Sequence, residues 1–370
     1  MMKQKMGPKI ILAAFIVLIC CSQFIWIIFE NCVGIENREN RELAARPEFS
    51  LDNYGVYSEE YDNYFNDHIP FRDYLITLNF ATDYFVFDSY KSDRAVIGKD
   101  LWFFLTDVGY DDPIGCYLGT NLLSEEELRA IADNCIAQRD FLAEQGKEFI
   151  IFIAPNKERI YYEYMPEEYG LPAERYRALQ IVEYLRDHTD IRVVYPYEEL
   201  MEAKNTLAQN IYYKTDTHWN YIGGYVGARA LLEEIGIEIP SVTDEQITIS
   251  TGDVYYGDLL SMLGIPRLSI FADNQYRVTG YDEHNVQILE SDFYNLYLYQ
   301  AENADPRKLY VIRDSFATAM AEYIGSQFND SCLRHNTTYT YDDFMTYDPD
   351  IVVLECVERR ILWLGAFSLQ

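Results

Sequence analysis

The sequence predicts an α/β fold of three layers, in which helices cover both faces of a mostly parallel sheet. Three observations support this prediction: apolar runs of strand length, helical patterns between them, and turn residues at the junctions. An uninterrupted apolar run is typical of a strand buried on both faces. The clearest runs are residues 149–154, 309–312 and 351–356.

The predicted elements follow one another from residue 95 to the C-terminus. Residues 95–105 are typical of a β-hairpin. A capping box formed by Ser124 and Glu127 begins a helix that ends near residue 144. Residues 243–300 are less regular and are predicted to be an insertion with β character. Further helices are predicted at residues 173–188, 197–203, 220–234 and 316–323, and a further strand at 191–195.

The N-terminus predicts a single membrane anchor at residues 10–29. This apolar stretch is interrupted only by Ser22 and Gln23 and is long enough to cross a bilayer as a helix. Lysines but no acids precede it, so residues 1–9 are predicted to be cytoplasmic. A cleaved signal peptide is the alternative, which calls for a shorter apolar region followed by small residues.

The rest of the chain is predicted to lie outside the cytoplasm, with a polar stalk at residues 30–55 and one domain at residues 56–370. Hydrophobic residues make up 49% of the 370, enough for a large core, and the net charge is −30 at pH 7. Such a charge disfavours binding to nucleic acid. It also repels a polyanionic substrate unless the site is locally basic. Seven cysteines and five histidines show no metal-ligand spacing, so we predict neither metal nor cofactor.

Two short strings contain the groups needed for acyl transfer. Ser315 follows the strand 309–312 and precedes a helix, so a strand-to-helix turn would expose its hydroxyl beside helix amide groups. Asp216 and His218 are two residues apart and would point to the same side of an extended segment. The carboxylate could then orient the imidazole, which would take the serine proton. Each string also has a structural interpretation, since Ser315 and residues 215–217 could simply cap helices.

Further candidates lie next to these elements. Asn156 and Lys157 follow the strand 149–154, at the edge where open sheets bind ligands. Asn156 could donate to an oxyanion and Lys157 could orient substrate, although both could equally belong to a loop turn after Pro155. Trp219, next to His218, is a further candidate for substrate contact, although a histidine beside a tryptophan is often simply packed.

Several strings together resemble the SGNH-hydrolase-like O-acetyltransferases of cell-surface polysaccharide modification. This group includes the alginate O-acetylation proteins and their relatives of the DHHW type. The matching strings run in family order across residues 36–360. They are Glu39–Leu43, Phe65–Asp73, Ile97–Phe104, Ala154–Lys157 with Ile160–Tyr161, Thr215–Asn220, Gly257–Leu259, Asp314–Phe316, Asp348–Asp350 and Val357–Arg359.

The resemblance implies an SGNH-like α/β/α domain with Ser315 as nucleophile, His218 as base and Asp216 as its orienting acid. One departure stands out. The familiar block around the serine reads Gly-Asp-Ser, and Arg313 replaces the glycine. We therefore expect a different local backbone or oxyanion pocket, or a charge that Arg313 points into the site. A surface cation paired with one of the many acids is the alternative.

The resemblance further implies O-acetyl transfer to a cell-surface or exported polysaccharide through a serine acyl-enzyme. By family analogy, a membrane-bound O-acyltransferase would supply the acyl donor. The expected location is the cell membrane, with the C-terminal domain on the cell surface or in the periplasm. Two alternatives stay open: a carbohydrate acetylesterase with the same triad, and a non-catalytic glycan-binding or scaffold protein of the same fold.

Overall fold

The computed structural model describes residues 11–17, 21, 44–50, 53–68, 72–87, 92–265 and 267–370. The chain divides into two compact units. One comprises Met1–Lys91 with Leu260–Leu268, and the other comprises Ser92–Leu259 with Ser269–Gln370. The first unit contains helices α2 (Tyr57–Asp67) and α3 (Arg72–Ala81), followed by a π-helical turn at Thr82–Val86.

The predicted membrane anchor and stalk fall mostly outside the described residues. Of residues 10–29, the structure describes 11–17 and 21, which are helical. Among the described residues, no helix combines the length and apolar character needed to cross a membrane. Of the stalk predicted at 30–55, the structure describes residues 44–50 and 53–55.

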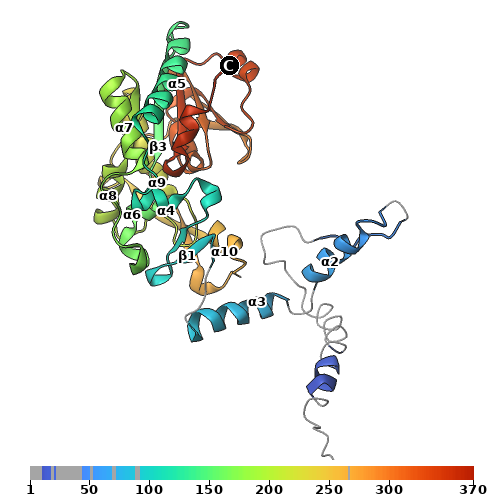
Figure 1. Cartoon of the computed structure of the whole chain (residues 1–370). Helices are drawn as coiled ribbons and strands as arrows, with labels where there is room; N and C mark the ends of the chain where they lie inside the picture. Colours follow the sequence, from blue (N-terminus) through green and yellow to red (C-terminus); the bar gives the residue numbers. More distant parts are fainter. Residues whose placement is uncertain are drawn as a thin grey trace, which may run out of the picture. The chain divides into compact units, whose positions relative to one another are not determined.

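A mixed seven-stranded sheet forms the centre of the second unit (Figure 1). Its strand order is β4-β3-β11-β9-β10-β8-β7. The first five strands in this order run parallel, and β8 and β7 extend one edge in antiparallel fashion. The predicted α/β fold is thus confirmed, with a sheet that is mixed. The strands are β3 (Glu148–Ala154), β4 (Arg192–Val194), β7 (Val286–Ser291), β8 (Leu296–Ala301), β9 (Asp305–Arg313), β10 (Phe328–His335) and β11 (Ile351–Val357).

Local sequence signals set the ends of the longer helices. The capping box of Ser124 and Glu127 is present. Asn220 caps α9, and Gly236 ends it with a φ of 92°, a conformation that favours glycine. The helices are α4 (Pro113–Leu118), α5 (Glu125–Ala143), α6 (Lys157–Ile160), α7 (Arg177–His188), α8 (Tyr197–Thr206), α9 (Tyr221–Ile235), α10 (Asp258–Met262), α11 (Ala321–Gly325) and α12 (Tyr341–Tyr347).

The predicted helix at residues 173–188 starts later than expected, at Arg177. Ala173 donates its N–H to the carbonyl of Tyr117 in α4, so this part of the segment is held by a neighbouring helix. The other helical predictions in this unit are confirmed to within a few residues, except that residues 316–323 begin as a 3₁₀ turn, η7 (Phe316–Met320), before α11.

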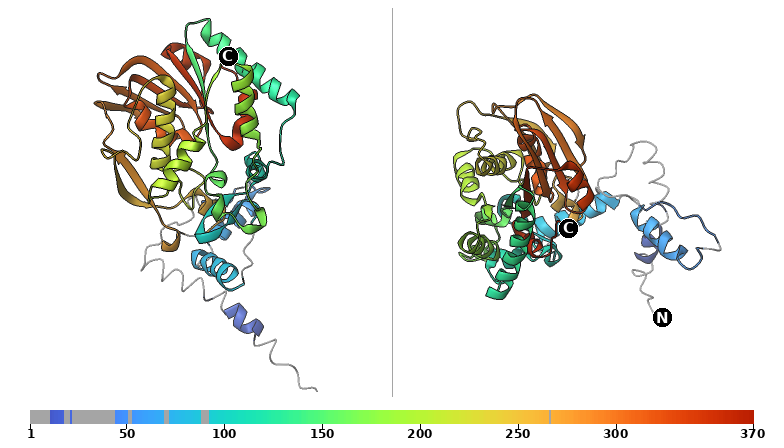
Figure 2. Two further views of the ribbon diagram at one scale, coloured as in Figure 1. Left: turned by 90° about the vertical axis from the view of Figure 1, so that its left-hand side faces the viewer. Right: turned by 90° about the horizontal axis from the view of Figure 1, so that it is seen from above.

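Helices cover both faces of the central sheet. In Figures 1 and 2, α5 and α7 lie on one side of it and α9 on the other. Alternate residues of a strand point to opposite faces. On β3, Ile150 and Phe152 belong to the core that includes α9, whereas Ile151 and Ile153 belong to the core that includes α5 and α7. Burial on both faces explains why β3 is apolar throughout.

Two small antiparallel sheets complete the second unit. The predicted hairpin is confirmed and consists of β1 (Ala95–Ile97) and β2 (Phe103–Leu105). The segment 243–300 contributes the pair β5 (Thr248–Tyr255) and β6 (Asp273–Thr279) as well as the edge strands β7 and β8. The residues that follow β5 approach the segment between α8 and α9, because Leu259 donates its N–H to the carbonyl of Thr215.

The carboxyl end of β9 is anchored by a buried acid on the neighbouring strand. Glu355 of β11 is 1% exposed and accepts a hydrogen bond of 2.8 Å from the N–H of Asp314. Its other oxygen has no partner among the described residues. Burial, together with the charge of Asp314, raises the pKa of Glu355 well above its usual value. The folded chain therefore favours the protonated form of Glu355.

We predict that Glu355→Gln stabilises the protein progressively as the pH rises above about 4.5. A folded pKa above the unfolded one contributes stability at low pH that is lost as the acid ionises, at about 1.4 kcal/mol for each unit of difference. Glutamine keeps the acceptor without the charge. Urea unfolding from pH 5 to 8 measures the effect, with the exposed Glu290→Gln of β7 as control. A stability difference that does not change with pH would contradict this account.

Candidate active site

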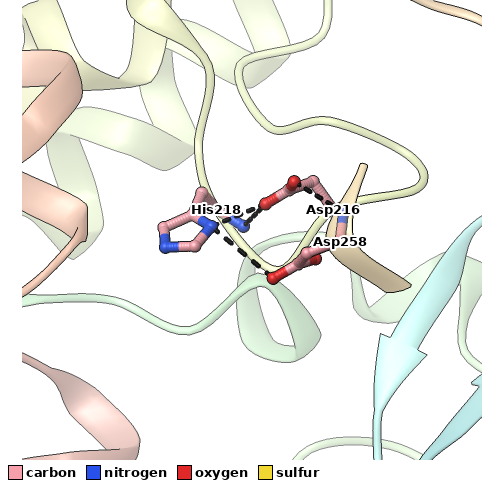
Figure 3. A group of neighbouring side chains, drawn as sticks. All are labelled: Asp216, His218 and Asp258. Atoms are coloured by element: carbon pink, nitrogen blue, oxygen red, sulfur yellow. Dashed lines mark hydrogen bonds and ion pairs between the residues drawn. The ribbon is translucent and has the colours of Figure 1, made fainter. Parts of the chain in front are cut away.

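Ser315, His218 and Asp216 form a continuous hydrogen-bonded relay. The Oγ of Ser315 lies 2.7 Å from the Nε2 of His218. The Nδ1 of the same ring lies 2.6 Å from the Oδ1 of Asp216 (Figure 3). Ser315 lies two residues after the end of β9, and the other two residues lie on the segment between α8 and α9. The two strings singled out in the sequence thus meet in the fold.

The bonding partners determine where the protons lie. An ionised carboxylate can only accept, so the Nδ1 of His218 must donate to Asp216. In the neutral imidazole, Nε2 is then an acceptor, and the hydroxyl of Ser315 donates to it. This is the arrangement that a general base requires. Trp219 adds a further link, because its Nε1 donates to the carbonyl of Phe316 at 2.8 Å and so ties the two strings together.

Asp216 is buried and fully hydrogen-bonded. Beyond the imidazole, its carboxylate accepts bonds from the N–H of His218 at 2.9 Å, the hydroxyl of Tyr255 at 2.7 Å and the N–H of Asp258 at 2.9 Å. Burial raises the pKa of Asp216, but the charge and hydrogen bond of His218, followed by the bonds from Tyr255 and Asp258, lower it well below its usual range. The carboxylate is therefore ionised at neutral pH.

Sequence reasoning missed Tyr255, which comes from the end of β5. Its neighbour Gly257 was noticed only as part of a matching string, and the structure gives the physical reason for glycine. A Cβ at this position would lie 2.1 Å from the carbonyl oxygen of Thr215 and 2.4 Å from the nitrogen of Asp216. The chain after β5 can therefore reach Asp216 only because Gly257 has no side chain.

Asp258 is a second acid beside the imidazole. Its Oδ2 lies 3.9 Å from the Nδ1 of His218 (Figure 3). It accepts bonds from the N–H and the hydroxyl of Thr217, each at 2.8 Å. Burial and the charge of Asp216 raise the pKa of Asp258. Burial lowers the pKa of His218, but Asp216 and, to a smaller extent, Asp258 outweigh this effect and leave that pKa above its usual value.

One ligand atom from each of Asp216, His218 and Asp258 lies within 4.8 Å of the others, close enough to share a cation. Hydrogen bonds already occupy these atoms. The Nδ1 of His218 points its proton at Asp216, and both Asp258 oxygens accept bonds from Thr217. A cation would have to displace these donors. The contacts fit a proton relay better than a metal site.

Lys157 contacts the segment between α8 and α9 that carries Asp216, and it is not one of the residues that line the cavity. It is fully buried, and its Nζ donates to the carbonyls of Tyr213 and Lys214, each at 3.2 Å, and to that of Asp216. Burial lowers the pKa of Lys157 to about 8. The ammonium therefore supports the backbone that carries Asp216. The sequence had instead predicted that Lys157 orients substrate.

Arg313 is also fully buried. Its guanidinium donates to the carbonyl of Phe293 at 2.8 Å, and more weakly to those of Asp314 at 3.2 Å and Asp292 at 3.5 Å. It also stacks on the ring of Tyr297 at 4.8 Å. Arg313 is thus neither a surface cation nor a charge pointed into the site. It fixes the connection between β7 and β8 to the strand that precedes Ser315.

The relay faces a cavity of about 650 Å³. Tyr110, Tyr294, Phe316 and Trp219 are among the side chains that line it. Asn156 is not one of the lining residues. It lies buried at the end of β3, where its N–H donates to Glu358 at 2.9 Å. The structure therefore brings together Ser315, His218, Asp216 and Trp219, and leaves Asn156 away from the cavity.

The backbone at Ser315 offers an alternative donor for a developing oxyanion. The N–H of Phe316 is already bonded to the Oδ1 of Asp314 at 2.8 Å. The N–H of Ser315 has no acceptor within the described part of the chain. It lies at the start of η7, where backbone amides stabilise negative charge.

We predict that Asp258→Asn lowers the pKa of His218, and by less than the loss of Asp216 would. The negative charge of Asp258 favours the protonated ring, and a partly exposed pair is screened by solvent. Asparagine keeps an acceptor for Thr217. An NMR titration of the His218 ring measures the shift. Asp253→Asn, an exposed acid on β5 outside the cavity lining, serves as the control. If the pKa of His218 is unchanged or raised in Asp258→Asn, the charge of Asp258 does not favour the protonated ring as we infer.

Comparison with known proteins places these features in a family. Residues 95–292 match the model of the SGNH hydrolase-like domain of the acetyltransferase AlgX, a range that includes Asp216 and His218 and ends before Ser315. The chain is 29% identical over 179 residues to the probable alginate O-acetylase AlgJ of Pseudomonas putida, which covers 47% of this chain and 43% of that protein. The corresponding protein of Pseudomonas syringae is 24% identical over 220 residues, covering 58% and 52%.

The chain spans about half the length of the curated relatives it matches. Among solved structures, PatB1 of Bacillus cereus has a similar fold, with a TM-score of 0.51 and 16% identity over 73% of this chain and 97% of that one. The resemblance inferred from short strings is confirmed, since the family model matches more than half of the chain. By this match, the chain belongs to the family of SGNH hydrolase-like domains of the AlgX acetyltransferase type.

Proposed function

We propose that this chain is an O-acetyltransferase that acts on a cell-surface or exported polysaccharide through an acetyl-serine intermediate. The observation that carries the proposal is the relay of Asp216, His218 and Ser315, with the serine hydroxyl bonded to Nε2 and facing a cavity. Membership of the AlgX-type family and the similarity to probable alginate O-acetylases support this reaction class.

In the first half-reaction, the Oγ of Ser315 attacks the carbonyl carbon of the acyl donor. The Nε2 of His218 takes the hydroxyl proton, and Asp216 stabilises the imidazolium that forms. When the bond to the leaving group breaks, His218 gives that proton to the leaving group. The N–H of Ser315 is our candidate donor to the tetrahedral oxyanion. The product is acetyl-Ser315 and a neutral imidazole.

In the second half-reaction, a sugar hydroxyl replaces the leaving group. His218 takes the proton of this hydroxyl as its oxygen attacks the acetyl carbon. The ester bond to Ser315 breaks, and the serine oxygen recovers the proton from His218. Atoms and charges are thus restored after one turnover. Asp258 and Tyr255 act as positioning residues for the imidazole and for Asp216.

We further propose where and with whom the chain works. Residues 10–29 anchor it as a single-pass membrane protein with residues 1–9 in the cytoplasm, and residues 30–55 form a stalk. The domain at 56–370, with its insertion at 243–300, then faces the cell surface or the periplasm. A membrane-bound O-acyltransferase supplies the acetyl group, because acetyl-coenzyme A is confined to the cytoplasm.

We predict that Ser315→Ala abolishes acylation of the protein and lowers acetyl transfer by at least about 10³-fold, because the nucleophile is lost. Full-length protein in detergent is incubated with 4-nitrophenyl acetate, and the acetylated peptide is identified by mass spectrometry. The matched control is Ser250→Ala, an exposed serine on β5 outside the cavity lining. If the Ser315→Ala variant is acetylated as fully as the unmodified protein, Ser315 is not the nucleophile, and the non-catalytic alternative remains open.

The same acyl-enzyme separates a transferase from an esterase. Water and a sugar hydroxyl compete for acetyl-Ser315, and our proposal favours the sugar. An oligosaccharide acceptor should therefore shorten the lifetime of acetyl-Ser315 and itself gain an acetyl ester. Release of free acetate at an unchanged rate, whatever acceptor is added, would favour the esterase.

A further inference from the structure

The described lining of the cavity that holds Ser315 is acidic apart from its two histidines, His218 and His335. Asp216 and Asp258 supply its carboxylates. Neither lysine nor arginine occurs among the described residues that line it. His335 lines it as well, but burial and the charge of Arg313 lower the pKa of this histidine, so it is uncharged near neutral pH. The two carboxylates thus agree in sign with the net charge of −30.

Three arginines near the lining already have partners. Arg313 is 0% exposed and donates to backbone carbonyls, Phe293 among them. Arg359 lies behind the ring of Phe316, buried, at 5.3 Å from the ring centre. Arg360 is exposed but pairs with Asp111 at 3.7 Å. A carboxylate entering the cavity could not pair with the buried Arg313 or Arg359 without displacing their present contacts, and Arg360 is not among the described residues that line the cavity.

Aromatic side chains supply most of the remaining wall. Phe293 and Tyr294 form the connection between β7 and β8, and the Tyr294 side chain is 76% exposed. Tyr110, on the same lining, is also exposed. An aromatic ring presents an apolar face, and tyrosine adds a hydroxyl that can bond to a polar partner. Such a wall suits the C–H faces and hydroxyls of a neutral sugar ring.

On the basis of the proposed function, we infer that the acceptor is an uncharged polysaccharide, and that this cavity excludes polyuronates. A carboxylate on the acceptor about 8 Å from a carboxylate of the cavity would repel it. At an effective dielectric constant of about 20, this repulsion lowers the rate or the affinity for the charged acceptor roughly thirtyfold relative to a neutral one, before salt screening. The Pseudomonas relatives carry alginate, a polyuronate, in their names. The lining of this chain does not support the same acceptor.

The test compares two acceptors of equal length with full-length acetylated protein. One is a β-1,4-linked glucose hexasaccharide and the other a β-1,4-linked mannuronate hexasaccharide. We expect kcat/KM for the uronate to be lower by tenfold or more, with a gap that narrows as salt is added. Equal or faster transfer to the uronate would overturn the inference.

A second pair of substrates decides the case in which neither hexasaccharide is acetylated. The rate of Ser315 acylation is measured with 4-nitrophenyl acetate and with its 3-carboxylate derivative, each normalised to its uncatalysed hydrolysis. Slower acylation by the anionic ester supports the inference, and equal or faster acylation overturns it. If no acetyl-Ser315 forms with either ester, the proposed function fails, and this inference fails with it.

A charge variant links the selectivity to the cavity wall. Tyr294→Lys places a cation beside the site and should shrink the gap between the neutral and the uronate acceptor by several-fold. The matched control is Tyr54→Lys, which makes the same change at a side chain of similar exposure, 74%, outside the lining. A gap that shrinks equally in both variants would assign the effect to net charge and not to the cavity.

Discussion

The buried carboxylate of Asp216 is the constraint on which the candidate site depends. An ionised acid inside a protein is stable only when donors surround it. Here the donors come from three places: the backbone and ring of His218, the hydroxyl of Tyr255, and the N–H of Asp258. Tyr255 and Asp258 together bring the segment that follows β5 to the segment that carries Asp216 and His218. Gly257 makes the approach possible, because a side chain there would collide with Thr215. The orientation of His218 towards Ser315 follows from this one satisfied charge.

Two buried cations complete the support of the site from behind. Lys157 holds the carbonyls of the segment that carries Asp216, and Arg313 holds those of the connection between β7 and β8. From the sequence alone, both side chains were candidates to place a positive charge next to the substrate. Because both ammonium and guanidinium groups bond to backbone, they stiffen the loops, and the described residues that line the cavity include neither lysine nor arginine. The arginine that replaces glycine in the Gly-Asp-Ser block therefore shapes the wall of the cavity.

The sequence predicted the parts of the fold that depend on local pattern. The buried strands β3, β9 and β11 are apolar runs, and the ends of α5 and α9 carry their caps. It missed β10, whose Asn329, Asp330 and Ser331 interrupt the apolar pattern, because pairing with β9 and β8 on both sides makes this strand. Likewise, the triad could be inferred from two strings, but the hydroxyl of Tyr255 arrives from a distant segment. The direction of a long side chain such as Lys157 depends on carbonyls that only the folded chain brings near.

The protonation of the His218 ring tests the central claim most directly. Because Asp216 can only accept, the neutral ring must carry its proton on Nδ1 and leave Nε2 free to accept from Ser315. Nitrogen-15 NMR of labelled protein at a pH above the His218 pKa distinguishes the two tautomers. Our account predicts a protonated Nδ1 and a bare Nε2, with this preference lost in Asp216→Ala. A proton found on Nε2 in the unmodified protein would contradict the relay.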